Sequence, residues 1–295
     1  MKLLFPCHPL KARQPDPDYA DEVNAAVKAG FVCEYYNLDL LRDSDVTGAL
    51  AVLPPANPEE KNILHRGWMM SDVLYAKLCA ELVVKGYVPV VTPEQYDEAH
   101  YLPSAYRHLV GLTPESAWIM GKEMDPAWAL YQQFIEAPAI VKDFVKSAKH
   151  RWKEACFIPP RTGREQFEQI LRAFLEARGG EFNKGIVLRR YHELVTLEQD
   201  IRGQPVHEEY RIFFWNGELL AASPPVRGNG PYDQMETWSD IARRFQSRFI
   251  AMDVARQADD KWIIIEVGDG GVSGLPLSVE PEKFYAALWE KRLSG

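Results

Sequence analysis

Two apolar segments near the C-terminal end of the sequence constrain its fold most strongly. They are FIAMDVARQ (249–257) and KWIIIEVGD (261–269), and only three residues separate them. Two strand-like runs this close together predict an antiparallel hairpin. A turn centred between Asp259 and Asp260 places Asp253 directly opposite Glu266.

The two opposed carboxylates need a compensating charge. Like charges facing each other destabilise a sheet, and each acid lies within an apolar run where an unpaired carboxylate is costly to bury. A divalent cation such as Mg²⁺ between them would remove this cost, and Mg²⁺ in proteins commonly comes with nucleotide phosphates. Asp269 is placed to supply a further oxygen. The alternative is another register, with both acids facing solvent.

The loop after Glu266, Gly268–Gly274, contains several glycines and permits a close approach of backbone amides to a ligand. Glycine-rich turns after a strand are also common without any ligand. No GxxxxGK[ST] or GxGxxG motif occurs, so the sequence contains neither of these phosphate-binding loops.

The first hundred residues alternate between strand and helix patterns, which predicts an α/β lobe. We expect strands at 2–6, 31–36, 48–53 and 88–92, with helices at 21–29 and 71–84. Prolines interrupt the helical stretches of 101–137, which makes that segment the expected connector. The boundary between two lobes is therefore placed near residue 110.

The second lobe is rich in strand patterns around one strong helix, at 165–178. The expected strands are 139–142, 185–190, 209–215, 218–223, 249–256 and 261–267. Asn216-Gly217 between two of them predicts a type I′ turn, because both central residues of that turn need positive φ.

Composition restricts the possible partners. The formal charge of −8, from 34 Lys+Arg against 42 Asp+Glu, argues against nucleic acid as a partner, although a local basic groove remains compatible with it. No apolar run is long enough for a membrane span, and the apolar part of MKLLFPCHPLKAR is too short for a signal peptide. A cytoplasmic protein with reduced, scattered cysteines is expected.

Basic residues lie at strand ends and within one strand. Lys142 ends an apolar strand, and Lys146 and Lys149 follow in a basic segment that either closes over phosphates or is simply solvated. Arg211 lies in the middle of HEEYRIFFWNG, where it pairs with Glu209 or another acid, or binds an anionic ligand. Arg189 has the same alternatives.

A series of motifs in the second lobe resembles the ATP-grasp superfamily. The motifs cover roughly 139–276 and run VKDFVKSAKHRW, VLRRYHEL, EEYRIFFWNGELLA, MDVA and IIEVGDGGVSGLP. The order is similar to that of a divergent clade that includes the eukaryotic cell-division-cycle assembly factor for a translation-initiation complex and many bacterial and phage proteins. The resemblance implies an α/β (α+β) ATP-grasp fold, with a pre-ATP-grasp domain at 1–110 and the ATP-grasp domain at 111–295.

The resemblance also implies roles for individual residues toward ATP and Mg²⁺. Lys142 and Lys149 would bind the phosphates, Arg211 the phosphates or the reacting group, and the backbone near Leu188 and Arg189 the adenine. Asp253 and Glu266 would hold Mg²⁺. Gly268 departs from the Asn that is common in this family two residues after the second acid, so Asp269 would take over that oxygen or a second Mg²⁺ would be held less firmly.

The activity implied by the resemblance is that of an ATP-dependent ligase, which phosphorylates a carboxylate so that an amine or another nucleophile can attack it. The acceptor, whether small molecule, peptide or protein, and the released nucleotide, ADP or AMP, are not specified by the sequence. Arg66 and Trp68 are candidates for the acceptor side. The alternatives are a non-catalytic ATP-binding assembly factor for a protein partner and a ligase of nucleic-acid ends.

Overall fold

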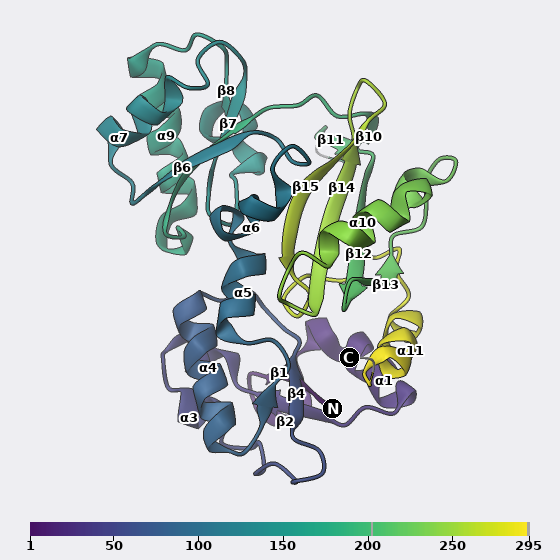
Figure 1. Ribbon diagram of the computed structural model, residues 1–295. Helices are drawn as coiled ribbons and strands as arrows, with labels where there is room; N and C mark the ends of the chain where they lie inside the picture. Colours follow the sequence, from purple (N-terminus) through teal and green to yellow (C-terminus); the bar gives the residue numbers. More distant parts are fainter. Residues whose placement is uncertain (202, 294–295) are drawn as a thin grey trace. The chain divides into compact units, whose positions relative to one another are not determined.

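A computed structural model describes residues 1–201 and 203–293 (Figure 1). The chain forms two compact units, neither of which is continuous in sequence. Unit 1 contains Met1–His100, Tyr210–Val254 and the chain from Val267 onward; unit 2 contains Tyr101–Glu209 and Ala255–Glu266. The expected boundary near residue 110 stays a prediction; in the structure, two later segments of the chain belong to the same unit as the first hundred residues.

Unit 1 is built around β1 (Lys2–His8), whose residues 3–7 are all buried. Leu3 pairs with Cys33 of β3 (Cys33–Tyr36) and with Leu64 of β4 (Asn62–His65), so β1 lies between two parallel neighbours. β5 (Val88–Pro89) extends the sheet beside β4, and β2 (Lys11–Pro15) turns back antiparallel from the end of β1. The predicted α/β character of this part of the chain is confirmed.

The strand predicted at 48–53 is wrong. This segment instead contains the end of helix α3 (Val46–Ala49) followed by a turn, because Asp45 accepts a hydrogen bond from the Gly48 backbone N–H (2.9 Å) and so caps a helical turn. The sheet strand in this region is β4, fourteen positions further along, whose apolar run is too short to stand out in the sequence.

Most of the remaining helices of unit 1 contribute buried residues to the apolar core, whereas η4 and α10 do not belong to that cluster, and α10 packs against β13 (Glu218–Ala222). The bounds of these helices are η1 (Pro17–Tyr19), α1 (Ala20–Ala29), α2 (Leu38–Arg42), α4 (Asp72–Val84), α5 (Pro93–His100), η4 (Gly230–Gln234), α10 (Met235–Ala242) and α11 (Pro281–Lys291). Helices α1 and α11, from opposite ends of the chain, lie side by side (Figure 1).

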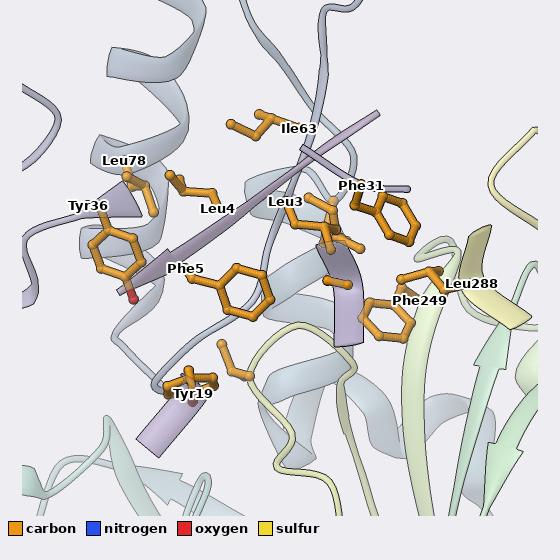
Figure 2. Packing of buried hydrophobic residues seen from close by; sticks show 14 of the residues in the cluster. Leu3, Leu4, Phe5, Tyr19, Phe31, Tyr36, Ile63, Leu78, Phe249 and Leu288 are labelled. Atoms are coloured by element: carbon orange, nitrogen blue, oxygen red, sulfur yellow. The ribbon is translucent and has the colours of Figure 1, made fainter. Parts of the chain in front are cut away.

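The core of unit 1 joins the two ends of the sequence. Figure 2 shows Leu3, Phe5 and Phe31 from the N-terminal segment in one cluster with Phe249 and Leu288. All five side chains are at most 4% exposed. The first hundred residues therefore share one apolar interior with the C-terminal segments, which explains why the compact unit does not end at a single boundary.

The hairpin predicted from the sequence belongs to a sheet with the order β13-β12-β14-β15. Its strands are β12 (Glu209–Trp215), β13 (Glu218–Ala222), β14 (Phe249–Arg256) and β15 (Trp262–Asp269). Asn216 and Gly217 have φ of 50° and 73°, which confirms the predicted turn between β12 and β13. At the other turn, the Gln257 N–H donates to the Lys261 carbonyl (2.8 Å).

Unit 2 contains an antiparallel sheet with the order β6-β9-β7-β8. Its elements are α6 (Leu102–Leu109), β6 (Ser116–Met120), α7 (Met124–Tyr131), β7 (Ala139–Asp143), η2 (Lys149–Arg151), α8 (Trp152–Ala155), β8 (Phe157–Ile158), α9 (Arg164–Arg178), η3 (Gly179–Glu181), β9 (Gly185–Arg190), β10 (Thr196–Gln199) and β11 (Pro205–His207). The expected connector at 101–137 thus supplies a sheet strand, β6. Helices α7 and α9 pack beside the sheet, and Tyr131 stacks on Phe167 (4.9 Å).

A buried guanidinium joins three segments of unit 1. Arg66, 1% exposed, donates from Nε and Nη2 to the Glu22 carboxylate (2.8 and 3.0 Å). Its Nη1 donates to the carbonyls of Gly270, Gly271 and Ser273 (3.2, 3.3 and 2.5 Å). Burial disfavours the charged form, but the Glu22 carboxylate outweighs it, so the pKa of Arg66 lies above its ordinary value. Arg66 is therefore enclosed by protein groups and does not line an open acceptor surface.

We predict that Arg66→Met lowers the free energy of unfolding by about 3–5 kcal/mol, because it removes the guanidinium that neutralises Glu22 and that donates to the carbonyls of Gly270 and Ser273. Denaturant unfolding measures this. Arg13→Met, at an exposed position of β2, is the matched control and changes stability by less than about 0.5 kcal/mol. Equal stabilities of the two variants would show that the Arg66 contacts are not stabilising.

Among the described residues, no helix has the length and apolar character needed to cross a membrane.

Candidate functional site

The predicted site residues fall in both compact units. Lys142, Lys149, Leu188, Arg189 and Glu266 belong to unit 2, whereas Arg211, Asp253 and Asp269 belong to unit 1. Each group is described within its own unit. The predicted register that places Asp253 opposite Glu266 joins residues of the two units and stays a prediction.

In unit 2, β7 and β15 bring a lysine and a glutamate together. Lys142 is 6% exposed, and its Nζ lies 3.8 Å from Oε1 of Glu266, whose side chain is about one-third exposed (33%). The sequence placed the first residue on phosphates and the second on a metal, but it gave no sign of their mutual contact. The pair forms because two strands distant in sequence lie within one unit.

Several cations surround this one carboxylate. Burial by itself raises the pKa of Glu266, but the charges of Lys142, Lys146, Lys149 and Arg189 outweigh it and hold the pKa below its ordinary value. In the part of the chain that the structure describes, Lys146 and Lys149 form no ion pair. A positive cluster with one acid, in a protein of charge −8, is an environment that favours a polyanion.

Burial also changes the ionisation of Lys142. Desolvation lowers its pKa to about 8, although the Glu266 charge acts in the opposite direction. The ammonium is therefore held at a cost, which an incoming anion would relieve. This is the behaviour expected of a lysine that binds a ligand charge and is not fully neutralised by the protein.

Arg189 has a positioning role that the sequence did not indicate. It is 4% exposed in β9, and its Nη2 donates to Thr113 Oγ1 (2.6 Å) and to the Ile264 carbonyl (3.3 Å). Thr113 Oγ1 also donates to the Ile264 carbonyl (2.8 Å). These bonds fix β15 two residues before Glu266. Burial lowers the pKa of Arg189 to about 10.

Leu188 is fully buried in the middle of β9, with Ala117 of β6 and Val141 of β7 as its cross-strand partners. Lys149, in contrast, is exposed in the 3₁₀ turn η2. The predicted basic segment after β7 thus has a short helical conformation that projects Lys149 outward.

In unit 1, Arg211 and Asp253 form a two-pronged ion pair. Arg211 Nε and Nη2 donate to Asp253 Oδ1 and Oδ2, each at 2.7 Å, and Nη1 donates to the Gly274 carbonyl (3.0 Å). The Asp253 side chain is 9% exposed. Of the two alternatives for Arg211, pairing with an acid is what this structure contains, and Asp253 is such an acid.

Asp269 is buried just past the end of the apolar run. Its Oδ1 accepts from the Gly271 N–H (2.9 Å), while Oδ2 has no hydrogen-bond partner among the described residues. Burial raises the pKa of Asp269 to about 7. A buried oxygen without a donor is compatible with a cation nearby.

Packing requires two glycines of this loop, Gly270 and Gly271. A Cβ on Gly271 would lie 2.5 Å from the His65 carbonyl oxygen, and one on Gly270 would lie 2.6 Å from the Phe249 ring. Because neither glycine has a side chain, the loop can approach β4 and β14, and the loop carbonyls can accept hydrogen bonds from Arg66. These two glycines therefore serve contacts within unit 1.

We predict that Lys142 makes stability depend on pH. Its folded pKa, about 8, is lower than the ordinary value of 10.5, so the folded state binds fewer protons than the unfolded state between these values. The loss of folding stability that comes from burying the charged Lys142 is fully present below pH 8. It disappears as the pH rises toward 10.5. Each pKa unit corresponds to about 1.4 kcal/mol, so the effect is on the order of a few kcal/mol.

The measurement is the free energy of unfolding without divalent cations, from about pH 7.5 to about pH 9.5. Over this range the wild type should gain stability relative to Lys142→Met. Lys153→Met, at an exposed position, should follow the wild type. A parallel pH dependence in wild type and Lys142→Met would contradict the lowered pKa.

Comparisons with known proteins identify the family and the fold. Residues 129–288, more than half of the chain, match the family described as ATP-grasp domain, R2K clade family 3. No curated protein matches the sequence significantly.

Solved structures share the fold along the whole chain. A RimK domain protein ATP-grasp from Sphaerobacter thermophilus aligns with a TM-score of 0.61 and 14% identity over 98% of both chains. D-cycloserine synthetase DcsG aligns with a TM-score of 0.60 and 12% identity over 99% of both chains. The ATP-grasp ligase PsnB was solved with a phosphomimetic variant of minimal precursor, Mg and ADP. It aligns with a TM-score of 0.56 and 8% identity over 99% of both chains.

The predicted α+β ATP-grasp fold is thereby confirmed, and the likeness to these structures, at such low identity, concerns the fold alone. Members of the matched family generally bind ATP and use Mg²⁺. On the family match over residues 129–288, the chain belongs to the ATP-grasp domain proteins of R2K clade family 3.

Proposed function

We propose that the protein is an ATP- and Mg²⁺-dependent ligase that activates a carboxylate as an acyl phosphate for attack by an amine or another nucleophile. The observation that carries this proposal is the cluster of Lys142, Lys146, Lys149 and Arg189 around Glu266. Such a cluster is suited to the phosphates of a nucleotide, and Glu266 is suited to the metal that accompanies them.

The residues fit Mg²⁺ only together with a nucleotide. In residues 1–201 and 203–293, no group of three or more His, Cys, Asp or Glu side chains forms a metal cage. Mg²⁺ usually keeps several waters and takes one or two carboxylates plus phosphate oxygens. Glu266, Asp253 and Asp269 are the proposed protein ligands. When bound, the metal would neutralise charge on the transferring phosphoryl group.

In the proposed reaction, a carboxylate oxygen of the substrate attacks the γ-phosphorus of ATP and ADP leaves. The acceptor amine then forms a C–N bond at the carbonyl carbon, the C–O bond to phosphate breaks, and phosphate leaves with that electron pair. The proton lost by the amine passes to phosphate or water. The protein supplies position and charge for these steps through Lys142, Lys149 and Arg211.

The ion pair between Arg211 and Asp253 gives this proposal a specific feature. Both Asp253 oxygens are occupied by the guanidinium, so a metal and Arg211 compete for the same carboxylate. We propose that ATP draws Arg211 toward its phosphates and leaves Asp253 for Mg²⁺. The backbone near Leu188 and Arg189 remains the proposed adenine contact, and the acceptor remains a small molecule, peptide or protein.

We predict that Glu266→Gln weakens ATP binding in Mg²⁺ by about tenfold or more, equivalent to about 1.4 kcal/mol, and leaves binding in EDTA nearly unchanged. The amide keeps the size of the side chain but removes its negative charge. Calorimetric titration of ATP with and without Mg²⁺ measures both. Glu165→Gln, at an exposed position of α9, is the matched control and should behave like the wild type.

The outcomes separate the possible functions. Absence of ATP binding to the wild type would reject the nucleotide site altogether. Tight Mg²⁺-dependent binding without release of ADP or AMP, across carboxylate and amine acceptors, would favour a non-catalytic ATP-binding assembly factor. Salt-sensitive RNA binding would favour ligation of nucleic-acid ends.

A further inference from the structure

A cavity lies in unit 1 where the order of its parallel strands reverses. The chain runs from β1 to β3 on one side and then to β4 on the other. The cavity holds about 250 Å³ and is lined by Cys7 and Pro9 at the end of β1, by residues that follow β3, and by Trp68 just after β4. In open α/β sheets, ligands bind outside the carboxyl ends of the strands at such a reversal.

The lining carries charges of both signs. Asp16, Asp39 and Arg42 face this cavity, together with the amide of Asn37. Within the described residues, none of these three charged side chains takes part in an ion pair. The pKa of the Cys7 thiol is raised mainly by burial. The negative charges of Asp16 and Asp39 raise it further, which agrees with their position near this thiol.

The remaining wall is apolar. Trp68 is 38% exposed, and its ring is held edge-on by Tyr19, with centroids 5.5 Å apart. Leu38 lies on the wall as well, and Cys7 is 3% exposed at its floor. An indole that is fixed on one side and open on the other offers an apolar surface to a ligand side chain.

Size and charge together restrict the ligand. Pockets for drug-sized molecules usually hold roughly 300–1,000 Å³, so this cavity suits a smaller molecule. A simple anion would meet two carboxylates, and a diamine would meet the Arg42 guanidinium. A molecule with one ammonium and one carboxylate satisfies both signs.

We propose that this cavity binds a free amino acid or a zwitterion of similar size, with its ammonium at Asp16 and Asp39, its carboxylate at Arg42 and its side chain against Trp68. We further propose that this molecule is a substrate of the ligase, an assignment that rests on the proposed function. Binding at the cavity itself does not depend on ATP.

The test is a thermal-shift screen of the full-length protein against each of the standard L-amino acids at millimolar concentration, without ATP or Mg²⁺, followed by calorimetry on the strongest binder. The α-amide and the N-acetyl derivative of that amino acid lack one charge each, so both should bind at least about tenfold more weakly. Asp39→Asn and Arg42→Gln should produce the same loss.

Asp43→Asn and Arg13→Gln, which change the same residue types outside the cavity, are matched controls and should bind as the wild type does. Glu266→Gln should also bind normally, so failure of the nucleotide site and failure of this cavity give different results. Failure of every amino acid to bind, or equal binding by the single-charge derivatives, would overturn the proposal.

Discussion

The buried guanidinium of Arg66 is the interaction on which the organisation of unit 1 depends. It bonds to Glu22 of α1 and to three carbonyls of the loop that follows β15, while Tyr285 of α11 donates to the same Glu22 (2.6 Å). A charge with so little exposure is tolerated because each of its three nitrogens donates to an acceptor. These bonds join the N-terminal sheet to segments more than two hundred residues away in sequence.

The loop that Arg66 holds also contacts the candidate site residues of unit 1. Gly274, just after the carbonyls that Arg66 holds, accepts from Arg211, and Arg211 in turn holds Asp253. The N-terminal part of the chain thus fixes the position of an arginine and an acid on strands β12 and β14. In unit 2, Arg189 has a comparable effect on β15, since it bonds to the Ile264 carbonyl two residues before Glu266.

Two kinds of charge arrangement distinguish the two units. In unit 1, one guanidinium bonds to both oxygens of Asp253, whereas in unit 2 Glu266 faces an excess of cations. The excess of cations in unit 2 favours a polyanionic ligand there. The cavity beside β1 has balanced charges instead and suits a smaller, zwitterionic ligand.

The local patterns of the sequence were sufficient for the elements with strong periodicity or a demanding turn. The strand of 249–256, the helix of 165–178 and the Asn216-Gly217 turn were predicted correctly, because alternation, helical spacing and positive φ are properties of neighbouring residues. The predicted strand at 48–53 was wrong, and β4 and β6 were missed, because the apolar runs of β4 and β6 are short and become strands through their partners.

The sequence by itself determined the fold class, the β14–β15 hairpin and the acids and bases that could bind nucleotide and metal. Only the tertiary structure decided that Lys142 contacts Glu266, that Arg211 pairs with Asp253, and that the chain ends share one core, because these contacts join residues whose separation in sequence leaves no local pattern.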